Sequence, residues 1–163
     1  MTTQIDNTQD TIDVRDVIAR FEELETIRES YTEAIDDLEN VANDTGADAD
    51  EQRKAFADLE GARADLVAWD TSESGQELQT LTALLADLRG NGGDEEWRGD
   101  WYPVTLIRGS YFQTYAQELA EDCGMIDETA QWPMTCIDWP QAARELQYDY
   151  TSCEIDGVAY WYR

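Results

Sequence analysis

The chain of 163 residues carries 37 Asp and Glu against 11 Lys and Arg and contains no His, so its formal net charge is −26. The absence of His excludes hydrolases of the Ser-His-Asp and Cys-His types and removes the usual general base and metal ligand. Solubility alone needs a net charge of only ~2–8 in magnitude, and larger values destabilise a compact chain through repulsion. Because 42% of the residues are hydrophobic, including 6 Trp and 8 Tyr, we nevertheless expect a folded protein.

The first ten residues, MTTQIDNTQD, contain no Lys or Arg and no apolar run, so we expect no signal peptide. Apolar runs elsewhere are far shorter than the ~20 residues that cross a bilayer, which favours a soluble, cytoplasmic protein. Cys123, Cys136 and Cys153 are odd in number, widely spaced and unaccompanied by His. They therefore predict reduced thiols rather than a disulfide framework or a zinc site.

Residues 11–89 contain no Pro and are rich in Ala, Leu, Glu, Asp and Arg, a composition typical of helices. Apolar residues first follow a heptad pattern, with Arg28 as one charged member, at Val14, Val17, Phe21, Leu24, Tyr31, Ile35 and Leu38. The pattern returns, with one break, at Phe56, Leu59, Leu66, Leu78, Leu81, Leu85 and Leu88.

Turn residues at 43–46 separate these two stretches, and helix N-terminal signatures follow at Asp48 with Glu51 and at Ser74 with Glu77. Residues 1–89 are therefore predicted to form an antiparallel, coiled-coil-like helical hairpin with a kink or restart near residues 71–75. Residues 90–100 form a Gly-rich acidic linker, which marks a domain boundary.

Residues 101–163 hold all three Pro, all three Cys and most of the Trp, as expected of a compact mixed domain. A strand is predicted over residues 101–107. Ser110 with Gln113 predicts a helix that Gly124 ends, with an apolar face of Phe112, Tyr115, Ala116 and Leu119. Asp138 predicts the start of a second helix, in which Trp139, Ala143 and Leu146 share a face.

Residues 150–155 and 158–162 flank Asp156-Gly157, a strong signal for a β-hairpin. We expect Trp139, Tyr150 and Trp161 to contribute to the core of this domain. The predicted fold class is α+β: a helical hairpin followed by a small α+β domain with a C-terminal β-hairpin.

Catalytic and cofactor-binding signals are weak throughout. The Gly-rich residues 90–93 precede three acidic residues, where a phosphate-binding loop needs Lys and Ser or Thr. The Asp-rich turn at 44–51 does not match the spacing of a calcium loop, and paired carboxylates are expected by chance in so acidic a chain. We therefore expect no enzyme activity, no cofactor and no bound metal, since an enzyme would need a concave site of perturbed carboxylates.

Acidic residues recur every three or four positions along the first predicted helix, away from the apolar seam, at Glu22, Glu25, Glu29, Glu33 and Asp36. At ~1.5 Å per residue this row covers roughly 21 Å. Further candidate partner-binding residues are Asp37, Asp94, Glu95, Glu96, Asp100, Glu118, Glu121 and Asp122. An ordinary solvated helix face is the alternative.

Two observations favour a binding surface. Both parts of the chain are negative, with 23 acidic and 7 basic residues over 1–89 and 14 and 4 over 90–163. The charges also lie on predicted helices, whereas acidic segments that only solvate tend to be unstructured. A rigid acidic rod is typical of a protein that binds a basic DNA-binding partner, since duplex DNA carries one negative charge per ~1.7 Å. Nucleic acid itself should be repelled.

The C-terminal part resembles the ArdA-type antirestriction proteins, DNA mimics of phages, plasmids and conjugative elements, over roughly residues 111–155. The residues that carry the resemblance are Tyr115, Ala116, Cys123, Gly124, Met125, Ile126, Ile137, Asp138, Trp139, Ala143, Arg144, Glu145, Leu146, Asp149, Tyr150 and Thr151. The resemblance implies inhibition of type I restriction enzymes by occupation of their DNA-binding groove, often as an elongated homodimer. The family's N-terminal β-rich domain is replaced here by the helical hairpin, so another DNA-dependent defence, such as a CRISPR effector, is an alternative target.

The sequence thus predicts a DNA-mimic inhibitor of a DNA-binding host-defence protein, acting in the cytoplasm of the host cell, without membrane association and possibly as a homodimer. The alternative is a coiled-coil interaction module of a phage or host assembly. In that case the seam of Phe21, Leu24, Tyr31 and Ile35 binds the partner and the acidity serves solubility. Salt separates the two, because it screens charges and does not weaken apolar burial.

Overall fold

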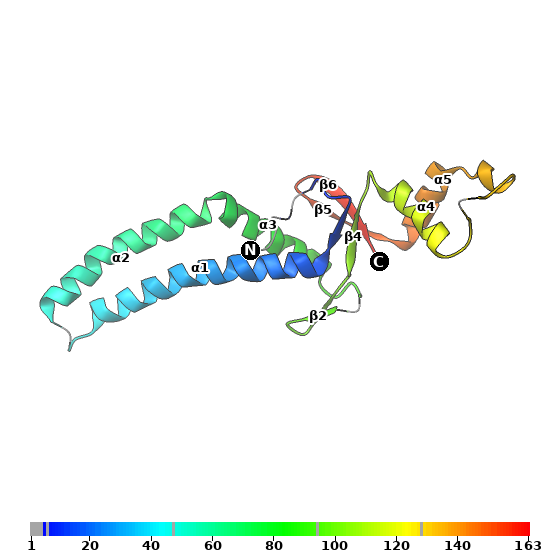
Figure 1. The fold of residues 1–163 in the computed structure, drawn as a ribbon. Coiled ribbons are helices and arrows are strands. Elements are labelled where there is room, and N and C mark those ends of the chain that lie inside the picture. Colours follow the sequence, from blue (N-terminus) through cyan, green and yellow to red (C-terminus); the bar gives the residue numbers. More distant parts are fainter. Residues whose placement is uncertain (1–4, 6, 47, 94, 128) are drawn as a thin grey trace. The chain divides into compact units, whose positions relative to one another are not determined.

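The computed structural model describes residues 5, 7–46, 48–93, 95–127 and 129–163 (Figure 1). The chain is α+β, as predicted, and divides into two compact units. The described part of the first unit is residues 19–82, and that of the second comprises residues up to 18 together with 83–163. The described residues up to 18 therefore group with the C-terminal part of the chain. The predicted domain boundaries at residues 89 and 101 do not include this grouping.

The first unit is a helical hairpin, built from α1 (Val14–Asn43), α2 (Ala49–Asp70) and the first part of α3 (Glu73–Leu88). Helices α1 and α2 run antiparallel in Figure 1, and the chain reverses between them as predicted. Asp48 caps α2, because its side chain accepts a hydrogen bond of 2.7 Å from the Asp50 backbone N–H. Asp48 therefore acts as the helix cap that its residue type predicts.

The apolar seam of the hairpin follows the predicted heptad in α1 but not throughout α2. Phe21 and Leu24 are buried, and the rings of Tyr31 and Trp69 lie 6.2 Å apart. Phe56, predicted in the seam, is instead 57% exposed, which corrects that assignment. The seam of α2 keeps the predicted Leu59 and Leu66 and is completed by Ala55, Ala62 and Trp69, all buried or half-buried. Ala55, 4% exposed, takes the seam position, and Phe56 lies a further ~100° around the helix.

The break between α2 and α3 lies where the sequence predicts it, but the capping residue differs. Ser72, not Ser74, precedes the helix, and its hydroxyl accepts a hydrogen bond of 3.3 Å from the Gly75 backbone N–H. Ser74 lies inside α3 because the chain leaves α2 at Thr71 and re-enters a helix within two residues. A Cβ atom on Gly75 would lie 2.4 Å from the Trp69 carbonyl oxygen, so this break requires glycine.

The second unit contains a four-stranded antiparallel sheet in the order β1-β4-β6-β5. Its strands are β1 (Thr11–Asp13), β4 (Thr105–Arg108), β6 (Val158–Tyr162) and β5 (Thr151–Ile155). Strand β1 was predicted as helix. It pairs with β4, with Ile12 opposite Leu106, and both side chains are buried. The partner lies far along the chain, so local composition gives no sign of it.

A small hairpin replaces most of the predicted linker and the start of the predicted strand over 101–107. It pairs β2 (Glu95–Trp97) with β3 (Asp100–Tyr102), joined by a turn in which Arg98 and Gly99 have φ values of 51° and 84°. Pro103 lies between β3 and β4. Because proline has no N–H to donate, it interrupts what was predicted as one strand.

The β5–β6 hairpin forms as predicted, with positive φ values at Asp156 and Gly157 of 46° and 80°. Helices α4 (Phe112–Asp122) and α5 (Trp139–Leu146) follow the predicted order, with short 3₁₀ turns at Met134–Cys136 and Gln147–Asp149. Gly124, with φ 66°, follows the end of α4, and Asp138 caps α5. Ser110 does not cap α4, which begins after Tyr111 without a side-chain cap.

The core between α4, α5 and the sheet is formed by Ile107, Phe112, Ala116 and Ala143. Tyr150 and Trp161 pack against it as predicted, and the Tyr150 ring meets Phe112 edge-on at 5.1 Å. Trp139 is only half-buried. Ala143 and Leu146 of the same helix make the core contact instead, because they lie one and two turns further along the face that meets α4.

Candidate functional site

Three arginines of the hairpin reach across the helices to carboxylates. Arg20 makes a two-pronged contact with Glu77, with Nε to Oε1 at 3.0 Å and Nη2 to Oε2 at 2.7 Å. Arg28 does the same with Asp70, at 2.8 and 3.2 Å. Near the turn, Nη2 of Arg63 lies 2.6 Å from Oε1 of Glu39. These pairs link the helices of the hairpin and engage three of its five cations, whereas Arg53 and Lys54 lie on the surface.

The most enclosed of these pairs is Arg20 with Glu77, whose side chains are 15% and 7% exposed. The hydrogen bond from Glu77 raises the pKa of Arg20 further above its ordinary value, and that from Glu23 adds to it. The hydrogen bond with Asp70 likewise raises the pKa of Arg28. Both guanidinium groups are therefore fully charged and engaged with carboxylates of the hairpin itself.

The predicted acidic row on α1 lies largely on the surface. Glu22, Glu29, Glu33, Asp36 and Asp37 are exposed. Glu25, predicted as part of the same row, is half-buried. The spacing of three and four residues keeps the exposed members along one side of the helix, as the sequence predicts.

Helix α2 adds exposed carboxylates that the sequence reasoning did not single out. They are Asp50, Glu51, Asp58, Glu60 and Asp65. Their spacing in the sequence does not form a continuous row. Whether they are exposed depends on which face of α2 packs against α1. Residues 19–82 together hold 18 acidic and 5 basic side chains, a formal net charge of −13.

The charge density of this hairpin is close to that of a nucleic-acid strand. The first-unit part of α1, residues 19–43, is roughly 36 Å long at ~1.5 Å per residue. One net negative charge thus falls every ~3 Å, compared with ~1.7 Å for duplex DNA and 3.4 Å for each of its strands. A partner whose cations are spaced for DNA would find carboxylates at comparable intervals.

The remaining predicted site residues belong to the second unit. Glu96, Glu121 and Asp122 are exposed. Asp100 is half-buried and lies 3.1 Å from Arg89, and Glu118 accepts hydrogen bonds of 2.7 and 2.8 Å from the Tyr111 hydroxyl. Asp94 and the side chain of Glu95 lie outside the described residues. Local partners therefore engage two of these carboxylates.

Within the described residues, no group of three or more His, Cys, Asp or Glu side chains is placed to hold a metal ion. Cys123 and Cys136 are exposed thiols, whereas Cys153 is buried in the sheet. Burial raises the pKa of Cys153 to about 12, so this thiol is unreactive near neutral pH. In the same part of the chain, no helix combines the length and apolarity that crossing a membrane requires.

A pocket of about 550 Å³ in the second unit brings Tyr115 and Tyr150 together, with Arg163 at its edge. The two hydroxyl oxygens are 2.8 Å apart. Burial, with the hydrogen bond to Tyr150, raises the pKa of Tyr115 well above its ordinary value. The hydroxyl therefore stays protonated, and its role there is to hydrogen-bond rather than to act as a base.

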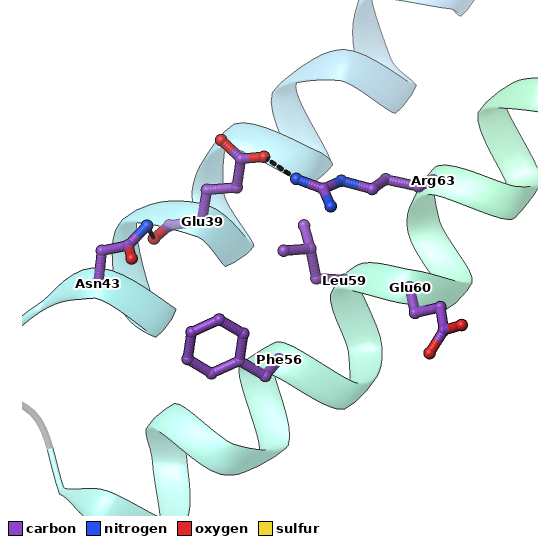
Figure 2. Close-up of a pocket in the computed structure, with 6 residues that line it drawn as sticks. All are labelled: Glu39, Asn43, Phe56, Leu59, Glu60 and Arg63. Carbon is purple, nitrogen blue, oxygen red and sulfur yellow. Dashed lines mark hydrogen bonds and ion pairs between the residues drawn. The ribbon is translucent and has the colours of Figure 1, made fainter.

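A second pocket, of about 640 Å³, lies between α1 and α2 near their turn (Figure 2). Glu39 and Asn43 line it from α1, and Phe56, Leu59, Glu60 and Arg63 from α2. Sequence reasoning missed it because it placed Phe56 in the seam. The signal that could have revealed this pocket is an aromatic residue, Phe56, one position outside the apolar seam of α2.

The hairpin thus presents an acidic surface on its helices. No protein-family model, curated protein or solved structure matches the chain.

Proposed function

We propose that the protein is a DNA mimic, which inhibits a DNA-binding protein of a host-defence system by occupying its basic DNA-binding groove. The observation that carries the proposal is the division of charge in the hairpin. Three of its five cations, Arg20, Arg28 and Arg63, are paired with carboxylates across the hairpin, and carboxylates outnumber the two remaining surface cations, Arg53 and Lys54, on its outer faces. The protein acts as a stoichiometric binder in the host cytoplasm, with no catalytic step of its own.

Electrostatics supports this function at two stages of binding. A surface of one sign accelerates encounter with an oppositely charged partner by ~10–1000-fold at low salt. Once bound, the carboxylates neutralise Lys and Arg side chains placed for phosphates, at an average of one net charge per ~3 Å of the hairpin's length. The competitor that the inhibitor displaces is duplex DNA itself.

The first target to test is a type I restriction enzyme, and the second is a CRISPR effector. The resemblance over residues 111–155 to ArdA-type antirestriction proteins suggests the first. The helical hairpin takes the place of that family's N-terminal domain, so a CRISPR effector is kept as the second target.

The coiled-coil alternative receives less support from the hairpin. Of the four expected contact residues of a partner helix, Phe21 and Leu24 are 8% and 1% exposed, and Tyr31 and Ile35 are half-buried. Because the seam is already filled within the chain, another helix could use it only if the hairpin opened. The exposed acidic faces need no such change.

The decisive experiment neutralises the α1 row without changing its shape. The test variant combines E22Q, E29Q, E33Q, D36N and D37N, all at exposed positions. A matched control removes five exposed charges from the second unit, none of them a candidate binding residue: D10N, D87N, D127N, E154Q and D156N. Both variants have the same net charge, so any difference between them reports the location of the charges.

With a purified type I restriction enzyme or CRISPR effector, we expect the test variant to bind about tenfold or more weakly, mainly through slower association at low salt. The control should bind within about threefold of the unmodified chain, because none of its changes lies on the α1 row. Duplex DNA should compete with the unmodified protein. A ternary complex of target, DNA and this protein would contradict mimicry.

A further inference from the structure

The pocket near the turn of the hairpin combines apolar walls with carboxylates, which is unusual on so polar a surface. The Phe56 ring forms one wall, 57% exposed, and the buried Leu59 lies beside it (Figure 2). A large aromatic surface is thus accessible from solvent in a region that is otherwise charged.

The polar groups of the pocket are mainly acceptors. Nδ2 of Asn43 donates to the Glu39 backbone carbonyl at 2.8 Å, which leaves its Oδ1 as an acceptor. Arg63 is the one cation among the six lining residues, and it contacts Oε1 of Glu39. Glu60 lies on the side of Phe56 and Leu59, one residue beyond Leu59 on α2. The lining therefore carries two carboxylates against one guanidinium, a net charge of −1.

We propose that this pocket receives an arginine side chain of the basic partner. This inference rests on the proposed function and adds one specific contact to it. The aliphatic stem of arginine covers the apolar wall, its guanidinium lies against the Phe56 ring, and its N–H groups donate to Asn43 Oδ1. The Glu60 carboxylate, four residues after Phe56 on α2, points away from Asn43 in Figure 2 and adds negative charge to the rim. Arginine fits better than lysine because its planar, weakly hydrated cation both stacks on an aromatic ring and donates several directed hydrogen bonds.

Other occupants fit the lining less well. A phosphate or carboxylate would meet the Glu39 and Glu60 side chains, and a purely apolar side chain would leave their rim unused. A second copy of this chain would bring another strongly negative surface against this one. Charge complementarity therefore selects a cation with an apolar stem.

This contact differs in kind from the imitation of phosphates. A DNA backbone offers charge to an arginine but no aromatic wall at the same point. The pocket therefore lets the hairpin hold one arginine of the groove more tightly than a phosphate does. Its contribution should also persist at salt concentrations that weaken the rest of the acidic face.

The pocket can be tested without the target, by a two-dimensional ¹⁵N–¹H NMR titration with N-acetyl-L-arginine amide. The uncharged N-acetyl-L-citrulline amide, nearly identical in shape, serves as the reference. We expect saturable shifts of backbone amides around Phe56, Glu60 and Asn43 with the arginine probe, and binding at least ~3-fold weaker with the citrulline probe.

Two variants complete the test. F56A removes the exposed ring and should weaken the arginine probe by ~3–10-fold. V67A removes an apolar side chain that is 62% exposed on the same helix but outside the pocket, and it should change nothing. Equal thermal melting of the two variants shows that F56A remains folded. Shifts spread over all carboxylates and equal in F56A and V67A would overturn the pocket.

The target assay separates this inference from the proposed function. If neutralising the α1 row weakens target binding and F56A does not, mimicry stands and the pocket is refuted. If F56A loses the arginine probe while neither variant affects any DNA-binding target, the pocket stands and mimicry is refuted. If both weaken target binding, and the loss in F56A persists at 0.5 M NaCl, both are supported.

Discussion

The pair of Arg20 and Glu77 couples α1 to α3 through two hydrogen bonds in a largely enclosed position. Glu77 is the more buried partner, so its carboxylate depends on this guanidinium to offset lost hydration. Removing Arg20 takes this ion pair from an enclosed carboxylate, whereas removing Glu77 leaves Arg20 paired with Glu23. Removing both leaves an apolar contact of similar volume, which proteins tolerate well.

We therefore expect Arg20→Met alone to lower the free energy of unfolding by about 3 kcal/mol, and Arg20→Met with Glu77→Leu to lower it by much less. Urea unfolding followed by circular dichroism measures both. The coupling energy comes from a double-mutant cycle with Glu77→Leu. Additive effects of the two single changes would show that the pair contributes nothing to stability.

The three cysteines should differ in reactivity. Cys123 and Cys136 are exposed and should be alkylated by iodoacetamide in the native protein, whereas Cys153 should react only after unfolding. Mass spectrometry after timed labelling resolves the three sites. Rapid native labelling of Cys153 would contradict its burial in the sheet.

The raised pKa of Cys153, about 12 against an ordinary 9.0, also predicts a pH dependence. The thiol loses its proton more easily in the unfolded chain, so its contribution to stability is complete below pH 9.0 and is lost as pH rises towards 12. Cys153→Ala should therefore flatten the alkaline fall in stability. Parallel pH profiles for variant and unmodified chain would argue against this cause.

At the level of single elements, local signals in the sequence predicted most of the helices and one hairpin. The heptad of α1, the turn before Asp48 and the Asp156-Gly157 turn all act through near neighbours, and all formed as expected. Strand β1 could not be predicted, because its pairing with β4 joins residues more than ninety positions apart. Phe56 was misplaced because a heptad beginning at Ala55 leaves a small residue in the seam.

Only part of the candidate site could be predicted from the sequence, because the rest depends on residues that lie far apart in the chain. The exposed row on α1 follows from spacing on one helix. The inward direction of Arg28 and Arg63 depends on which residues of the facing helix stand opposite, and these lie 42 and 24 positions away in the sequence. The pocket beside Phe56 likewise exists only once two helices are brought into register.

The break between α2 and α3 gives a test at this scale. Gly75→Ala should lower the free energy of unfolding by at least ~1–3 kcal/mol, because the new Cβ would meet the backbone of α2 and force it to shift. Gly61→Ala is the matched control, since its Cβ would meet nothing within 4 Å. There alanine should stabilise the helix by ~0.5–1 kcal/mol. Similar effects of both changes on urea unfolding would contradict the close approach at Gly75.

At the level of the whole molecule, a net charge of −26 means that self-repulsion opposes folding. Salt should therefore stabilise the protein, with most of the gain below about 0.3 M, where the Debye length falls under ~6 Å. Differential scanning calorimetry at 10 mM and 300 mM NaCl should show a higher Tm at the higher concentration. The variant neutralised at five α1 positions should gain less, and a Tm independent of salt would contradict strong repulsion.

The hairpin uses separate residues for its internal contacts and for its outer surface, and this has a consequence for engineering. Its arginine pairs and its seam both recur along the helix axis, and neither uses the outer carboxylates. Inserting one heptad into α1 and a facing heptad into α2 should therefore lengthen the hairpin by ~10 Å without changing its cross-section. The protein is in this sense a scaffold of adjustable length, from which inhibitors could be matched to shorter or longer DNA-binding grooves.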